Sequence, residues 1–153
     1  MRPEPITIAS LGIETVNWAD PNHRAGVGAS GQTYEIRPQV DDDGEAWAVA
    51  IDNQPCLLVS SLYTAVLASE QIEALAIFKG QGAASLSHAA LVGAQLMAGH
   101  ELSYWLNQVA ATGLSDDDQV KANAGLQDTE AMLAQIDASL AARGIFVENT
   151  TIH

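Results

Sequence analysis

Residues 32–51 read QTYEIRPQVDDDGEAWAVAI, and they carry the clearest β-hairpin pattern in the chain. Polar and apolar residues alternate over residues 32–40. In residues 46–51 the large apolar side chains fall on one face and the alanines on the other. Between these runs, Asp41-Asp42-Asp43-Gly44 supplies residues that favour tight turns. The pattern therefore predicts two antiparallel strands joined by an acidic turn.

The segments on either side of this hairpin extend the β region. Residues 6–8 are a short strand candidate, and residues 17–31 collect Asp, Pro, Asn and Gly, which is typical of a loop. After a second turn at residues 52–55, residues 56–59 are expected to form a third strand. The N-terminal third thus predicts a small antiparallel sheet.

A helix is expected next, from Leu62 to Lys79, with Ser60 or Ser61 as its N-cap and Gly80 at its end. The alternative is that residues 62–67 stay extended and Ser69 caps a shorter helix. We favour the longer helix.

Beyond residue 82 the pattern changes to sustained helical periodicity. One stripe with spacings of four and three comprises Leu91, Gln95, Ala98, Leu102, Trp105 and Val109. A second stripe on the same segment comprises Leu86, Gly93, Met97, His100 and Tyr104. A helix that is apolar on two sides is usually packed between two neighbours.

The last helix is expected over residues 116–142, after a C-terminal cap at Gly113 and a capping box formed by Ser115 and Asp118. Its heptad-like stripe comprises Ala122, Leu126, Thr129, Leu133, Ile136 and Leu140. The stripe is short, which favours an antiparallel helical hairpin. Gly144 ends the helix, and residues 145–147 form either an edge strand or a tail.

These elements predict one α+β domain over residues 1–153. Residues 1–59 are mainly β and loops, and residues 60–80 form one helix that packs on the antiparallel sheet. Residues 84–143 form the antiparallel helical hairpin, and residues 144–153 are a tail or edge strand.

The net charge of the chain restricts the kinds of molecule that it can bind, but it says little about whether the protein is an enzyme. The 19 Asp and Glu residues outnumber 6 Lys and Arg, for a formal net charge of −13. Such a surface repels nucleic acid and anionic membranes and attracts basic proteins. There is neither a signal-peptide pattern nor a long apolar run, so we expect a soluble cytoplasmic protein. Cys56 is the single cysteine, which excludes an internal disulfide.

Gly26-Val27-Gly28-Ala29-Ser30-Gly31 has the glycine spacing of a dinucleotide-binding loop. That loop needs a preceding strand and a following helix, whereas here turn-like residues precede it and strand-like residues follow it. The context therefore favours a flexible surface loop, and we expect no cofactor.

The acidic runs could in principle coordinate a cation, but neither has the ligand spacing of a calcium loop. The first comprises Asp41, Asp42, Asp43 and Glu45, and it fits a solvated turn. The second comprises Asp116, Asp117 and Asp118, and it fits a helix N-terminus that favours negative charge. We expect no metal site.

No set of reactive residues predicts catalysis. His100 lies on an apolar stripe, so it is expected to be a hydrogen-bonded core residue. Cys56 lies in an apolar strand, where a buried thiol is inert. Glu70 and Glu73 could act as an acid/base pair, but solvent exposure is the default on a helix. We therefore expect no enzymatic role.

The sequence predicts a protein-binding module, most specifically an acidic inhibitor or regulator that docks on a basic surface of nucleic-acid-handling machinery by copying phosphate charge. Both acidic runs are candidate contact sites, and Trp18, in the expected loop, is the candidate apolar anchor. The alternative is a structural subunit of a viral or other symmetric assembly, paired through one of the helical stripes. An uncharacterised hydrolase is a minor alternative.

Overall fold

A sheet and three helices make up the computed structural model, which describes residues 14–20, 22–41 and 44–145. The strands are β1 (Val16–Trp18), β2 (Ala25–Gly28), β3 (Thr33–Asp41), β4 (Gly44–Ile51) and β5 (Gln54–Val59). The helices are α2 (Leu62–Gln81), α3 (His88–Ala110) and α4 (Asp116–Ala142). The expected α+β class, with its N-terminal antiparallel sheet and C-terminal helical hairpin, is confirmed.

The five strands follow one another across the sheet in chain order, each antiparallel to the next. The predicted hairpin forms β3 and β4, where Ile36 pairs with Val49. The predicted third strand is β5, which begins two residues early at Gln54. The expectation of a loop over residues 17–31 is wrong, because β1 and β2 pair there. Residues 6–8 lie outside the described residues.

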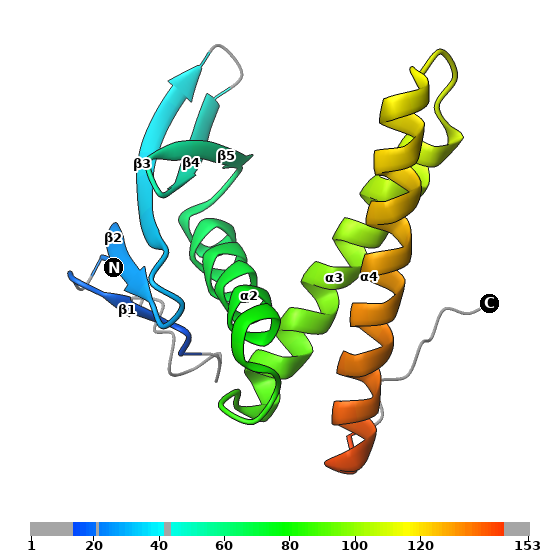
Figure 1. Cartoon of the computed structure of the whole chain (residues 1–153). Coiled ribbons are helices and arrows are strands. Elements are labelled where there is room, and N and C mark those ends of the chain that lie inside the picture. The colour runs from blue at the N-terminus through cyan, green and yellow to red at the C-terminus, as the bar shows by residue number, and fades with distance from the viewer. Residues whose placement is uncertain (1–13, 21, 42–43, 146–153) are drawn as a thin grey trace.

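Helix α2 lies across the inner face of the sheet (Figure 1). The Ser61 hydroxyl caps it by accepting a hydrogen bond from the amide of Thr64 at 3.1 Å, which confirms the longer of the two predicted helices. The helix ends at Gly82, which has a positive φ of 80°, and not at Gly80. One apolar core comprises Ile36, Val49, Ala65 and Val66.

Helices α3 and α4 form an antiparallel pair, because Leu86 lies beside Arg143 and Trp105 lies beside Gly125. The predicted α4 stripe is confirmed: Ala122, Thr129, Ile136 and Leu140 are buried, and Leu126 and Leu133 are half-buried. Gly125 is needed for this packing, since a Cβ there would lie 2.4 Å from the Trp105 ring. A second core joins α2, α3 and α4.

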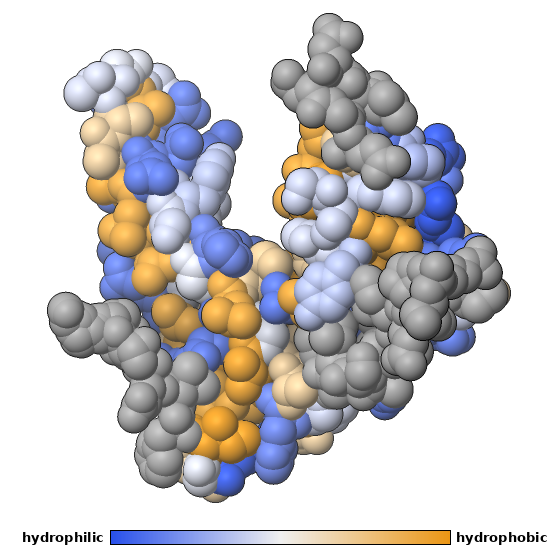
Figure 2. All heavy atoms as spheres, turned by 180° about the vertical axis from the view of Figure 1, so that it is seen from behind, coloured by the Kyte–Doolittle hydropathy of each residue, from blue (hydrophilic) through white to orange (hydrophobic). Residues whose placement is uncertain are grey.

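The molecule has the outline of a V (Figures 1 and 2). One side holds the sheet and α2, and the other is the α3–α4 hairpin, residues 88–142, which we call the helical arm. Over its first part α3 packs between α2 and α4, and Glu101 still pairs with Lys79 of α2, whereas the end of α3 continues beside α4. The second stripe of α3 is accordingly buried at Leu86 and Gly93 and exposed at Tyr104. No helix of the described residues has both the length and the apolarity to cross a membrane.

Candidate functional site

Two carboxylates on α2 are completely buried where the helix meets the first two strands. Glu70 accepts hydrogen bonds from the Thr15 amide at 2.5 Å and from the Thr15 hydroxyl at 2.6 Å. It also accepts the Val16 amide at 3.1 Å and the Trp18 indole N–H at 2.9 Å. Four neutral donors from β1 and its preceding residue therefore hold one carboxylate.

Glu73 makes equivalent contacts with the turn between β2 and β3 and with Tyr34 in β3. It accepts the Ser30 amide at 2.6 Å, the Ser30 hydroxyl at 2.9 Å and the Tyr34 hydroxyl at 2.8 Å. Burial is the larger cause and the hydrogen bond to Glu73 is the smaller cause of a pKa for Tyr34 that lies well above its ordinary value. The hydroxyl therefore stays protonated and remains a donor to the carboxylate.

Gly28 allows this carboxylate to reach the sheet. A Cβ at Gly28 would lie 2.0 Å from the carboxyl carbon of Glu73, so no other residue fits without displacing the side chain. Gly26 and Gly28 lie in β2, and Gly31 occupies the following turn with φ of 97°. The expected flexible loop is thus a strand and a tight turn, whose glycines admit a carboxylate from the chain itself.

The expectation that Glu70 and Glu73 are exposed is wrong. Residues 66, 70, 73 and 77 recur at spacings of four, three and four, which places both carboxylates on the buried stripe of α2. That spacing was the available signal, and it was outweighed by the usual exposure of glutamate. With each carboxylate already accepting several hydrogen bonds, the geometry serves to fasten strands to a helix.

The histidines and the cysteine lie apart. His88 and His100 are exposed, so the prediction of a buried His100 is wrong: the neighbouring Glu101 pairs with Lys79 of α2, but the His100 side chain lies on the exposed side of α3. Cys56 is also exposed rather than buried, and its thiol donates to the Gln54 carbonyl at 3.2 Å. Within residues 14–20, 22–41 and 44–145, no three His, Cys, Asp or Glu side chains gather as metal ligands would.

The sequence analysis placed Trp18 in a loop, and that prediction is wrong. It is half-buried in β1, with its indole N–H bonded to Glu70 and its ring edge-on to His23 at 5.6 Å. Nearby, the Arg24 guanidinium stacks on the Trp47 ring at 4.6 Å. Both tryptophans therefore help to fill the space between the sheet and α2.

The end of β3 at Asp41 and the start of α4 at Asp116 lie on opposite sides of the V (Figure 1). Asp116, Asp117 and Asp118 are all exposed in the first turn of α4, where Ser115 accepts a hydrogen bond from the Asp118 amide at 3.1 Å. Asp41 ends β3. Asp42 and Asp43 lie outside the described residues, as do the side chains of Asp41 and Glu45.

Helix α4 carries acidic residues well beyond its first turn. Its exposed acidic side chains are Asp116, Asp117, Asp118, Asp128, Glu130 and Asp137, against one lysine, Lys121. Arg143, which caps the helix, donates to the carbonyls of Leu86 and Ala83. The helix therefore presents a long acidic surface that the two compact runs alone did not indicate.

The helical arm also exposes large apolar side chains. On α3, Leu96 and Tyr104 are 50% and 54% exposed, and Val120 on α4 is 68% exposed. Figure 2 shows hydrophobic surface along the arm, interspersed with polar groups. Val120 begins a second heptad-spaced stripe on the outer side of α4, all of it exposed: Val120, Ala124, Gln127, Ala131, Ala134, Ala138 and Ala141.

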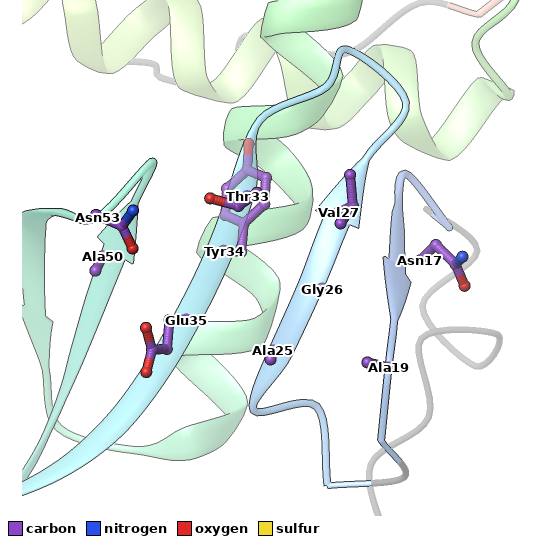
Figure 3. Close-up of a pocket in the computed structure, with 10 residues that line it drawn as sticks. All are labelled: Asn17, Ala19, Ala25, Gly26, Val27, Thr33, Tyr34, Glu35, Ala50 and Asn53. Carbon is purple, nitrogen blue, oxygen red and sulfur yellow. The ribbon is translucent and has the colours of Figure 1, made fainter.

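The outer face of the sheet has two shallow hollows that share Glu35, Ala50 and Asn53. The first, of about 450 Å³, lies over β1 to β4 (Figure 3). The labelled side chains of Asn17, Val27 and Thr33 border it. Most of its lining is small or uncharged, and Glu35 is its one charged group.

No protein-family model matches this chain, and neither curated proteins nor solved structures give a significant match.

Proposed function

We propose that this chain is a non-enzymatic protein-binding module of the cytoplasm whose helical arm docks on a basic protein surface. The observation that carries the proposal is the acidity of α4, which has six exposed acidic side chains and one lysine; one of the six, Asp137, accepts a hydrogen bond from Gln95 of α3. Opposite charge accelerates encounter and selects basic partners. The basic grooves of nucleic-acid-handling machinery have this chemistry, so an inhibitor or regulator of such machinery is the specific form of the proposal.

Charge alone gives little affinity at an exposed surface, because ion pairs there contribute only about 0–1 kcal/mol each. Stable binding needs an apolar anchor at the centre of the contact. Val120 stands one turn from the acidic start of α4, and it takes the anchor role that the sequence had suggested for Trp18. The proposed contact thus combines the Asp116–Asp118 run with Val120.

The test is affinity capture from the native host at low and at high salt, with two matched variants. The arm variant is D116N/D117N/D128N/E130Q, and the control removes four carboxylates from the hairpin run as D41N/D42N/D43N/E45Q. We expect a basic protein that is retained at low salt, released at high salt and lost with the arm variant alone. Loss with the hairpin variant alone, or retention that ignores salt, would contradict the proposal.

A structural subunit of a symmetric assembly is the second candidate. It is favoured by Leu96, Tyr104 and the exposed heptad stripe that starts at Val120, since an alanine-rich helix face permits close pairing with another helix. Sedimentation velocity over a concentration series separates the two candidates. Self-association that V120D abolishes would support the subunit, whereas a monomer at every concentration would remove it.

A further inference from the structure

The heptad-spaced stripe on the outer side of α4, from Val120 to Ala141, is exposed along its whole length, and we call it the outer stripe. Five of its seven residues are alanines, and Val120 is 68% exposed. The stripe extends over about 32 Å of the helix axis. Small side chains at spacings of four and three allow a second helix to approach closely and to pack its larger side chains between them. The outer stripe therefore has the shape of a seam for one further helix.

The two rows of residues beside the outer stripe determine which charge that helix should carry. In a heptad seam these flanking rows face the flanking rows of the partner helix, so their charges select the partner. Here the rows are acidic, and their one basic residue is Lys121. One of the carboxylates, Asp137, also accepts a hydrogen bond from Gln95 of α3 at 2.6 Å. The rows, all exposed, are Asp116, Asn123, Glu130 and Asp137 on one side and Lys121, Asp128, Gln135 and Ala142 on the other.

A second copy of the chain matches the outer stripe poorly. If two α4 helices paired through this stripe, Lys121 would be the one basic residue that each copy could offer to the flanking carboxylates of the other. Two chains of formal net charge −13 also repel each other as they approach. A helix with lysine or arginine in its flanking rows would instead meet opposite charge along both sides of the seam.

We infer that the outer stripe binds one α-helix of a partner protein, a helix with an apolar heptad stripe and with lysine or arginine in its flanking rows. This inference rests on the proposed function, and it specifies the basic surface of the partner as the face of a single helix. Apolar packing along the whole seam adds to the anchor at Val120, and the flanking charges select the partner.

The test is the binding of two synthetic peptides to the intact chain, measured by fluorescence anisotropy and circular dichroism. The heptad peptide has leucine and alanine at its seam positions and lysine in its flanking rows, and the scrambled peptide has the same composition without heptad spacing. We expect the heptad peptide to bind roughly tenfold more tightly or better, and to become helical on binding. Equal binding of the two peptides would overturn the inference, and it would leave charge-driven docking of the helical arm standing.

Two variants locate the contact on α4. A131Q/A138Q places larger side chains in the outer stripe without a change of charge, and we expect the affinity for the heptad peptide to fall by roughly tenfold. S103Q/N107Q introduces the same residue at exposed positions of α3 and should bind the peptide as the native chain does. Unchanged affinity in A131Q/A138Q, or equal losses in both variants, would overturn the inference.

A third peptide, with glutamate in place of lysine in the flanking rows, tests the choice of partner. We expect it to bind at least roughly tenfold more weakly than the lysine peptide at low salt. Equal binding would show that the flanking carboxylates do not select the partner. Self-association of the native chain that A131Q/A138Q abolishes would make a second copy the occupant and would also overturn the inference. The proposed function fails separately, if the arm variant still captures the same protein.

Discussion

Glu70 and Glu73 hold β1, β2 and the turn at residues 29–32, which we call the β1–β2 unit, against α2 through carboxylate hydrogen bonds. By contrast, α3 and α4 hold each other through interlocking apolar side chains. Both attachments use the same helical spacing of three and four residues. They differ in what the buried stripe contains. The first attachment is sensitive to the loss of single hydrogen-bond donors, and the second is sensitive to the loss of side-chain volume.

The largest loss of stability is expected from a substitution in the apolar core at the base of the helical arm. Leu91→Ala removes a completely buried side chain from the core shared by α2, α3 and α4, and we expect a loss of about 2–5 kcal/mol in unfolding free energy. Leu96→Ala is the matched control on the same helix, because Leu96 is half exposed. Urea unfolding at pH 7 measures both variants. Equal losses would show that the base of the arm is not a packed core.

A glycine substitution addresses the β1–β2 unit. Gly28→Ala forces a methyl group into the Glu73 carboxylate, and we expect a loss of about 1–3 kcal/mol. Gly99→Ala, in α3, meets no atom within 4 Å, so we expect a gain of about 0.5–1 kcal/mol from improved helix propensity. Thermal and urea unfolding test the opposite signs. A stabilising Gly28→Ala would contradict the close approach of Glu73.

Removal of one donor tests the hydrogen bonds to Glu73. Tyr34→Phe leaves the ring in place but removes the 2.8 Å bond, and we expect a loss of about 1–3 kcal/mol at pH 7. Burial raises the pKa of Tyr34 in the folded protein. The contribution of Tyr34 to stability is therefore fully present below about pH 10 and declines at higher pH, because the unfolded chain loses the tyrosine proton first. The phenylalanine variant should show less of this alkaline decline. The same decline in both proteins would exclude Tyr34 as its source.

The smallest expected effect concerns the far end of the helical arm. Ser115→Ala removes the cap of α4, and we expect a loss of about 0.5–2 kcal/mol. Ser103→Ala, at an exposed position within α3, is the control and should be neutral or slightly stabilising. Circular dichroism during urea unfolding compares the two. A neutral Ser115→Ala would show that the three following aspartates stabilise the helix start without the cap.

The contrast also explains which features the sequence could predict. The α4 stripe and the β3–β4 hairpin are local patterns, so their residues alone were enough. The β1–β2 unit was missed because its inward positions are glycines, and their complement, Glu73, lies 43 residues after Ser30. His100 was misplaced because an apolar stripe indicates a partner but does not show how much of the stripe is covered: Gly93 is buried, whereas His100 and Tyr104 are exposed.

Site-specific photo-crosslinking tests most directly the claim that the helical arm is the binding surface. A benzoylphenylalanine is placed at Val120 on the arm or at Val27 on the outer face of the sheet, two valines that are 68% and 50% exposed. We predict that Val120 crosslinks to a basic protein in the native host and that Val27 does not. Crosslinks from Val27 alone, or equally from both positions, would contradict the account.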